Sequence, residues 1–154
     1  MLFFLLSCGA AVEPAPVTDL GECIPEPWVQ GCTHPYPEGL GYMIEDAAAE
    51  AGIEPAWLAA TVWRESGCNA SARGAAGEIG LTQIHPRVWA AKLGASPDGW
   101  EMWEPESNLR YSASILRRLR DSSSSEREMF RKYNGRGPKA RKYAAKQMAV
   151  LAKL

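Results

Sequence analysis

The feature that most restricts the fold is the spacing of apolar residues over residues 39–154. Most apolar residues in this range recur with the period of an α-helix, and no long stretch alternates between apolar and polar residues. Apolar residues three and four positions apart share one face of an α-helix, whereas a half-buried strand needs alternation. The 154-residue chain is long enough for one domain with a sizeable core. The pattern therefore predicts one all-α domain over residues 39–154.

Turn and capping residues divide this domain into helices. Gly52 and Gly135 end apolar stretches, and prolines stand where new ones begin. Asn108 is expected to cap a helix. Residues 66–79 and 94–105 are expected to be irregular, with a short helical piece between the first loop and Pro86. The helices are expected over residues 42–51, 55–65, 86–93, 108–121, 128–133 and 138–151.

The N-terminal segment has the composition of an export signal. Residues 1–8 are mostly apolar and end in Leu5-Leu6-Ser7-Cys8, which is typical of a lipobox whose cysteine carries lipid. No Lys or Arg precedes them, and the apolar stretch is shorter than the usual ~7–15 residues. Either the signal begins upstream or it is minimal, and a plain apolar tail is the alternative. We expect export to the periplasm, with outer-membrane anchoring if Cys8 is lipidated.

Residues 9–38 predict a tether, because they hold six of the eleven prolines and lack periodic apolar spacing. Cys23 and Cys32 enclose a short Pro-rich loop and are expected to form a disulfide in an oxidising compartment. Cys68 would then be a small buried thiol. The cysteine spacing does not match a zinc site, so no metal or cofactor is expected.

Glu65 is the candidate for chemistry. It stands at the end of a mostly apolar predicted helix and precedes a Gly-containing loop. Partial desolvation at such a junction raises the pKa of a carboxyl, which can then hold a proton near neutral pH. Such a group can act as a general acid in glycosidic cleavage. A solvated glutamate at a helix end is the alternative.

Four blocks of sequence follow one another at defined spacing. Glu65-Ser66 precedes Gly77 by twelve residues and Gly80-Leu81-Thr82-Gln83 by fifteen to eighteen residues, counted from Glu65. Residues 103–109, residues 130–135 and Tyr143 come next. Together the blocks resemble the lytic transglycosylases of the soluble Slt type, which share the goose-type lysozyme fold. Thr82 stands where that family usually has Met.

The resemblance implies a lysozyme-like catalytic domain with Glu65 as its single acid and base. Such enzymes cleave the β-1,4 bond between N-acetylmuramic acid and N-acetylglucosamine and leave a 1,6-anhydro end. Peptidoglycan strands would be the partner of a monomeric protein, in wall turnover, a secretion or conjugation machine, or phage entry. The resemblance also implies supporting or substrate-binding roles for Ser66, Gln83, Tyr133, Asn134 and Tyr143.

Besides Thr82, three further positions depart from the family pattern. Gly74 replaces a Ser that touches the acetamido group of the sugar, and Lys139 stands where an acidic residue is frequent. Glu78 replaces a common Ala and is a candidate second carboxylate that activates water. The alternatives are therefore a lysozyme-like muramidase, which is a hydrolase, and a non-catalytic wall-binding or assembly protein.

The net charge of −1 conceals two oppositely charged halves. Residues 1–107 hold 4 Lys or Arg and 15 Asp or Glu, whereas residues 108–154 hold 13 and 3. Solvated helix faces are one interpretation. The other is a basic face for the carboxylates of wall polymer, with Arg117, Arg118 and Arg120 as candidates. A nucleic-acid partner is not favoured, because the N-terminal segment indicates export.

Overall fold

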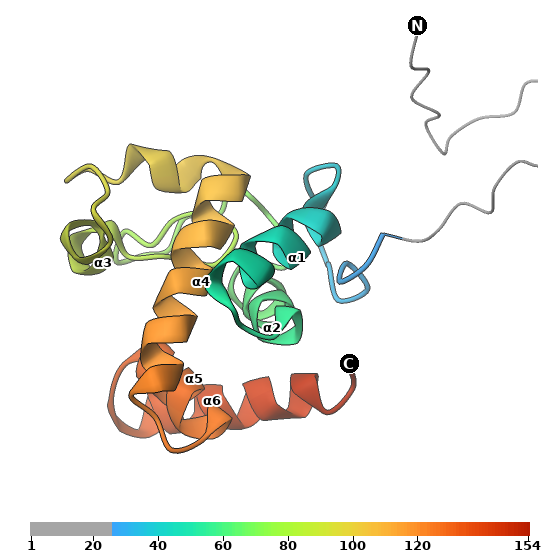
Figure 1. Ribbon diagram of the computed structural model, residues 1–154, viewed down its shortest axis with the longest axis vertical. Helices are drawn as coiled ribbons and strands as arrows, with labels where there is room; N and C mark the ends of the chain where they lie inside the picture. Colours follow the sequence, from blue (N-terminus) through green and yellow to red (C-terminus); the bar gives the residue numbers. More distant parts are fainter. Residues whose placement is uncertain (1–25) are drawn as a thin grey trace, which may run out of the picture.

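The computed structural model describes residues 26–154, which form six α-helices and one 3-10 helix (Figure 1). Within this range β-pairing is limited to isolated bridges joining Arg73 to Ile79 and Ile79 to Ile84. The all-α prediction is confirmed. No helix in the described range is both long and apolar enough to cross a membrane. Residues 1–8, with Cys8, and Cys23 lie outside it. The elements are α1 Leu40–Ala51, α2 Pro55–Glu65, α3 Pro86–Leu93, η1 Trp100–Trp103, α4 Pro105–Asp121, α5 Glu126–Asn134 and α6 Gly137–Leu151.

Most helix ends lie where local sequence predicts them. Gly52 follows α1 in the left-handed conformation, and Ser125 caps α5 by accepting a hydrogen bond from the Glu128 N–H at 3.2 Å. The predicted Asn108 cap is wrong. Helix α4 begins three residues earlier, at Pro105, whose ring suits a first helical position. Asn108 instead lies fully buried in the first turn.

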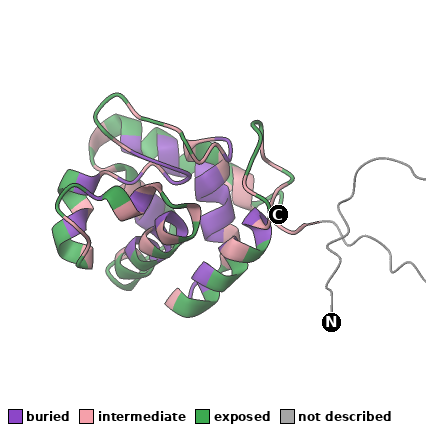
Figure 2. Ribbon diagram, turned by 90° about the horizontal axis from the view of Figure 1, so that it is seen from above, coloured by how far each residue is buried: buried purple, intermediate pink, exposed green. Residues whose placement is uncertain are grey.

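Helix α4 is the centre of the domain. It runs through the middle of the molecule and packs against α1, α2, α5 and η1, while α6 packs against both α5 and α2 (Figure 1). The faces that meet are buried and the outer faces are exposed (Figure 2). This packing brings the C-terminal end of α2 beside α6. Side chains fully buried in the main core include Leu40, Ile44, Leu58, Leu109, Leu116 and Phe130.

The disulfide differs from the prediction. Cys32 is bonded to Cys68, with their Cα atoms 5.3 Å apart, so the predicted Cys23–Cys32 pair and the free thiol at Cys68 are both wrong. The reason is a contact between segments distant in the sequence. The carbonyl of Gly67 accepts hydrogen bonds from the N–H groups of Thr33 at 3.2 Å and His34 at 3.1 Å. Residues 26–38 are therefore attached to the domain just beyond α2.

Candidate active site

Glu65 lies at the end of α2 and lines a cavity of about 300 Å³ between α2, α3, α5 and the loop before α3. The cavity brings together residues from distant parts of the chain. Four other predicted residues, Glu78, Gln83, Tyr133 and Asn134, share its lining with Glu65, whereas Ser66 and Tyr143 do not line it. The remaining lining residues are Ile84, His85, Val88, Trp89, Ile115, Lys132 and Gly135.

Burial is the largest influence on Glu65 and raises the pKa of its carboxyl above the ordinary value. A hydrogen bond from Tyr143 and the positive charge of Arg64 lower this pKa, and the negative charge of Glu78 raises it. Because desolvation outweighs the opposing contacts, the pKa remains raised. Glu65 can therefore keep its proton closer to neutral pH than an exposed glutamate can.

Tyr143 approaches Glu65 from α6. The side-chain amide of Gln147, one turn further along α6, donates to the Tyr143 hydroxyl oxygen at 2.9 Å. This bond occupies the oxygen and leaves the hydroxyl hydrogen for Glu65. Burial, followed by the charge of Glu65, raises the pKa of Tyr143 well above its ordinary value. Tyr143 therefore stays a neutral donor.

Tyr133 connects α5 to the loop that forms the cavity wall. Its hydroxyl donates to the Thr82 carbonyl at 2.9 Å and lies 3.1 Å from the Ser112 hydroxyl on α4. Burial and the nearby Glu65 charge raise the pKa of Tyr133, so it too remains neutral. Three separate segments are therefore joined at one hydroxyl beside the cavity.

Ser66 lies behind Glu65. Its hydroxyl is 2.7 Å from the Leu81 carbonyl and 3.2 Å from the Val62 carbonyl, and it accepts the Cys68 N–H at 3.1 Å. These contacts join the end of α2 to the loop carrying Gln83. They act on the backbone around Glu65 and do not reach into the cavity.

Asn108 holds the same loop from the other side. Its side-chain oxygen accepts from the Thr82 N–H at 3.0 Å and the Thr82 hydroxyl at 2.7 Å. Its amide donates to the carbonyls of Met102 at 2.8 Å and Ile79 at 3.2 Å. Gly80 has φ +75°, and a Cβ there would lie 2.4 Å from the Asn108 amide nitrogen. Only glycine fits this approach.

Gln83 lines the cavity but also serves its own loop. Its backbone is left-handed, with φ +50°. Its side-chain nitrogen donates to the carbonyls of Ala72 at 3.1 Å and Gly80 at 3.0 Å. The amide nitrogen is therefore used within the protein, and the loop fixes the orientation of the side chain.

Gly74 and Glu78 form a matched pair. A Cβ at Gly74 would lie 2.2 Å from one Glu78 carboxylate oxygen and 2.8 Å from the Glu78 Cβ. The same oxygen accepts the Ala76 N–H at 3.0 Å. The Glu78 side chain therefore occupies the space that any side chain at position 74 would need. The absence of a side chain at position 74 and the placement of the Glu78 side chain therefore depend on each other.

Two polar residues that position the tyrosines were not predicted from the sequence. Ser112 stands in the apolar stripe of α4, and Gln147 follows Tyr143 by four residues on α6. Both are fully buried. A polar residue on the buried face of a helix is the signal that could have identified them, because a buried polar group needs a hydrogen-bond partner.

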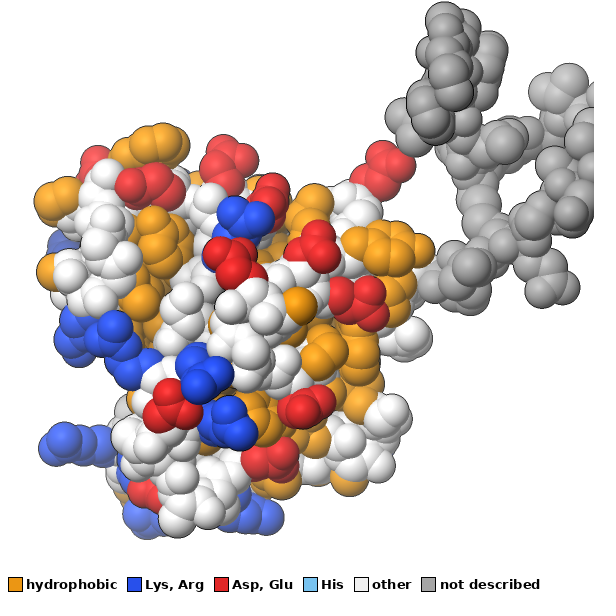
Figure 3. Space-filling view, viewed as in Figure 1, with side chains coloured by type: hydrophobic (Ala, Val, Ile, Leu, Met, Phe, Trp, Pro, Cys, Tyr) orange, Lys and Arg blue, Asp and Glu red, His pale blue; other side chains and the backbone are white. Residues whose placement is uncertain are grey.

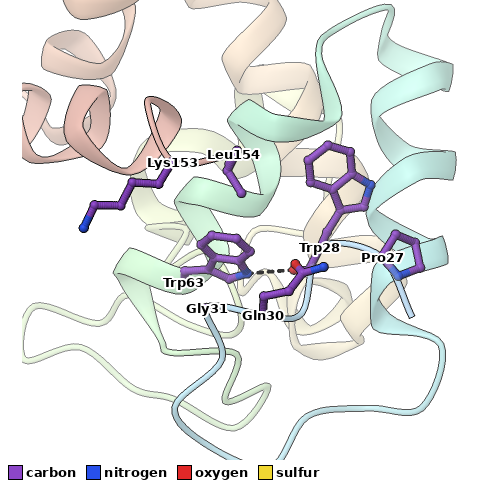
Figure 4. A pocket seen from close by; sticks show the side chains of 7 residues that line it. All are labelled: Pro27, Trp28, Gln30, Gly31, Trp63, Lys153 and Leu154. Carbon is purple, nitrogen blue, oxygen red and sulfur yellow. Dashed lines mark hydrogen bonds between the residues drawn. The ribbon is translucent and has the colours of Figure 1, made fainter. Parts of the chain in front are cut away.

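A larger cavity, of about 490 Å³, lies beside Trp63 and contains none of the predicted site residues (Figure 4). Trp63 and Glu65 are two residues apart on α2, so they project to opposite sides of the helix. The Trp63 indole N–H donates to the Trp28 backbone carbonyl at 2.7 Å, and the Trp28 indole N–H donates to the Glu45 carboxylate at 3.0 Å. These bonds attach residues 26–38 to the domain.

A comparison with known families matches a range close to the predicted domain of residues 39–154. A family model described as "Transglycosylase SLT domain" matches residues 42–153, more than two thirds of the 154-residue chain. The matched range contains Glu65, Tyr143 and every residue that lines the Glu65 cavity. No curated protein matches the chain. Across residues 26–154 no group of three or more His, Cys, Asp or Glu side chains could hold a metal ion.

Proposed function

This chain belongs to the transglycosylase SLT family, the catalytic domain of lytic transglycosylases, and on that basis we propose that it cleaves peptidoglycan with Glu65 as the single acid and base. The observation that carries the proposal is the position of Glu65. It lies at a helix end, lines a cavity with polar neighbours, and has a pKa raised by burial. The proposed substrate is the bond between N-acetylmuramic acid and N-acetylglucosamine.

In the first step, protonated Glu65 gives its proton to the glycosidic oxygen, and the bond from this oxygen to C1 of the muramic acid breaks. The raised pKa supports this step, because the acid must be protonated at working pH. The 2-acetamido group of the sugar can stabilise the positive charge that develops at C1. One protein carboxyl then suffices where ordinary glycosidases use two.

In the second step, Glu65 acts as a carboxylate and takes the proton of the muramoyl C6 hydroxyl. The C6 oxygen bonds to C1 and gives the 1,6-anhydro product, so Glu65 regains its proton and no water is consumed. The Tyr143 hydroxyl supports the change of state, because its hydrogen bond favours the carboxylate that burial disfavours.

The remaining predicted residues are proposed to position substrate or Glu65. Gln83 and Asn134 line the cavity and can contact sugar. Tyr133 can contact sugar at the cavity wall and holds the loop carrying Gln83 through the Thr82 carbonyl. Ser66 would act through the loop behind Glu65.

The test is the Glu65→Gln variant, assayed on purified sacculi with mass spectrometry of the products. We expect 1,6-anhydro-muramoyl ends from the parent protein and a rate lower by about 10²–10⁴-fold in the variant, the usual contribution of a general acid. Glu54→Gln is the matched control, because Glu54 is exposed at the other end of α2 and makes no side-chain capping bond. Equal rates for Glu65→Gln and the parent would refute the proposal.

A muramidase is the second candidate, because Glu78 lines the same cavity as Glu65. A carboxylate there could activate water, which would produce reducing ends instead of anhydro ends. Product analysis separates the two reactions, and loss of the reducing ends in Glu78→Gln would assign the water-activating role. If sacculi bind but neither product forms, the chain is a non-catalytic wall-binding protein.

The proposed working place is the periplasm, since the family acts on the cell wall. Residues 1–8 and Cys8 are proposed as the export and lipid-attachment signal. The mass of the mature N-terminus tests this, because a lipidated Cys8 adds acyl chains and becomes the first residue.

A further inference from the structure

A second polar cavity, of about 350 Å³, adjoins the Glu65 cavity and shares His85 with it. Its wall combines the turn that begins at Arg73, the first residues of α3 and Trp103 of η1. Glu78 belongs to this same turn but lines the Glu65 side. A molecule bound at Glu65 therefore has a neighbouring space into which a substituent can extend.

Two arginines dominate the charge of this second cavity. Arg73 and Arg87 both line it, against one carboxylate, that of Asp98. Neither arginine forms an ion pair with any residue in the described range. Helix α3 also begins here, and the N-terminal end of a helix carries partial positive charge. The cavity therefore favours an anion.

Arg73 is held in place while its guanidinium donates no hydrogen bond to any residue from 26 to 154. Its guanidinium lies over the Trp103 ring at 4.2 Å from the centroid. A stacked guanidinium keeps its N–H groups at the edge of the plane, where they can bind a carboxylate through two parallel hydrogen bonds. The stacking reduces the side-chain freedom that binding would otherwise have to restrict.

We propose that the Arg73–Arg87 cavity binds a carboxylate of the peptide carried by the glycan strand, while the sugar backbone occupies the Glu65 cavity. This inference rests on the proposed function, because it takes its ligand from the same peptidoglycan substrate. The peptides of this polymer bear carboxylates at short distances from the sugar. Peptide-bearing strands are therefore the preferred substrate over peptide-free strands.

The experiment compares two soluble substrates, peptide-bearing glycan fragments and the same fragments stripped of peptide by an amidase. Loss of a charge-assisted hydrogen bond lowers affinity about tenfold, so each of Arg73→Gln and Arg87→Gln should raise KM by about that factor on the first substrate. Neither should change kcat/KM on the second. Arg73→Lys keeps the charge but loses the paired geometry, so it should recover only part of the loss.

Arg110→Gln is the matched control, an exposed arginine on α4 that lines neither cavity and should affect neither substrate. Arg87 is exposed and makes no described side-chain bond, so its variant keeps the test valid if Arg73→Gln unfolds. Equal losses on both substrates, or no loss on the peptide-bearing one, would overturn the inference.

A binding measurement separates this inference from the proposed function. In the Glu65→Gln background, the dissociation constant for peptide-bearing fragments should be lower than for stripped fragments, and Arg73→Gln should remove the difference. If the parent protein cleaves neither substrate, the proposed function fails and the binding result alone decides the role of the arginines. Equal binding of both fragments in the Glu65→Gln background would overturn the inference.

Discussion

At Glu65, two neighbouring side chains change the pKa of the same carboxyl in opposite directions. The Tyr143 hydroxyl stabilises the carboxylate and lowers the pKa, whereas the negative charge of Glu78 raises it. The first step of the proposed reaction needs the protonated acid, so kcat/KM should fall as pH rises through the pKa of Glu65 in the free enzyme. The high-pH limb of the rate profile therefore reports this pKa.

Tyr143→Phe and Glu78→Gln should move this limb in opposite directions. Removing the Tyr143 hydroxyl leaves desolvation less opposed, so the limb moves to higher pH. Removing the Glu78 charge lowers the pKa of Glu65, so the limb moves to lower pH. Initial rates of sacculus clearing at low substrate concentration, measured across pH, give the high-pH limb of each variant.

Tyr42→Phe is the control for this pair, because Tyr42 is half exposed on α1 and lines no part of the Glu65 cavity. Its profile should match that of the parent. Limbs that move in the same direction in Tyr143→Phe and Glu78→Gln would contradict the expected opposite effects of the two side chains on the pKa of Glu65.

At the scale of the structural elements, residues 26–38 precede the helices and are attached to the backbone close to Glu65. The Cys32–Cys68 bond attaches it three residues after Glu65 and closes a loop with a sequence separation of 36. Constraining the unfolded chain over such a loop contributes about 2–4 kcal/mol to the free energy of unfolding. The disulfide therefore stabilises the backbone that follows α2.

Replacing both cysteines, Cys32→Ser with Cys68→Ser, should lower the free energy of unfolding by about 2–4 kcal/mol in denaturant titrations. Cys68 is completely buried, so a polar serine there adds to the loss. The parent protein in reductant should approach the double variant in stability. Equal stability of the parent and the double variant would contradict the stabilising role of the bond.

The sequence predicted helices well because their signals are local. The ends of α1 and α2 follow from Gly52 and Pro55 and from apolar residues within a few turns. The prediction that Asn108 caps a helix was wrong because it used only the local capping preference. The hydrogen-bond partners of Asn108 come from other segments: they are the carbonyls of Ile79 and Met102 and the Thr82 backbone. The predicted disulfide pairing was wrong for the same reason, since the actual pairing depends on the contact between residues 32–34 and Gly67.

The candidate site shows the same division. The position of Glu65 at a helix end before a loop could be predicted from residues 57–67 alone. The link between Gly74 and Glu78 could not, because it depends on the turn that places the Glu78 side chain over Gly74. Gln147 and Ser112 were missed because each acts through a tyrosine and not through Glu65.

Over the whole molecule, the charge division of the sequence has a spatial counterpart. Most Lys and Arg side chains on the face shown gather toward the part formed by α4, α5 and α6, and most Asp and Glu side chains lie elsewhere (Figure 3). Helix α6 carries four Lys or Arg and no Asp or Glu. The net charge of −1 therefore does not describe the electrostatic field near α6.

Arg117, Arg118 and Arg120, the candidates for a basic face, are used within the protein. Arg117 pairs with Asp121 at 3.0 Å and donates to the carbonyls of Ala51 and Gly52 at 3.3 Å. Arg118 donates to the Lys92 carbonyl at 3.4 Å, and Arg120 lies 5.9 Å from the centre of the Trp57 ring. Neutralising them changes intramolecular contacts together with charge.

The exposed cations that make no ion pair in the described range lie further along the chain and form what we call the α5–α6 basic surface. From α5 to α6 this surface consists of Arg127, Arg136, Lys139, Arg141, Lys142 and Lys146, and Lys153 beyond α6 is a further exposed cation without an ion pair. No acidic residue follows Glu128 in the sequence. This surface is the better candidate for contact with the carboxylates of wall polymer.

Neutralising Arg141, Lys142 and Lys146 together, each to Gln, should therefore weaken sacculus binding at low salt. Because exposed charges are screened over about 8 Å at physiological ionic strength, the difference from the parent should shrink as salt increases. Binding of small neutral chitooligosaccharides should not change, since they carry no carboxylates. The matched triple variant of Arg117, Arg118 and Arg120 to Gln should lose thermal stability and keep more of its sacculus binding. Equal losses on sacculi and on neutral oligosaccharides would show that α6 acts by supporting the Tyr143 side of the cavity and not by attracting the polymer.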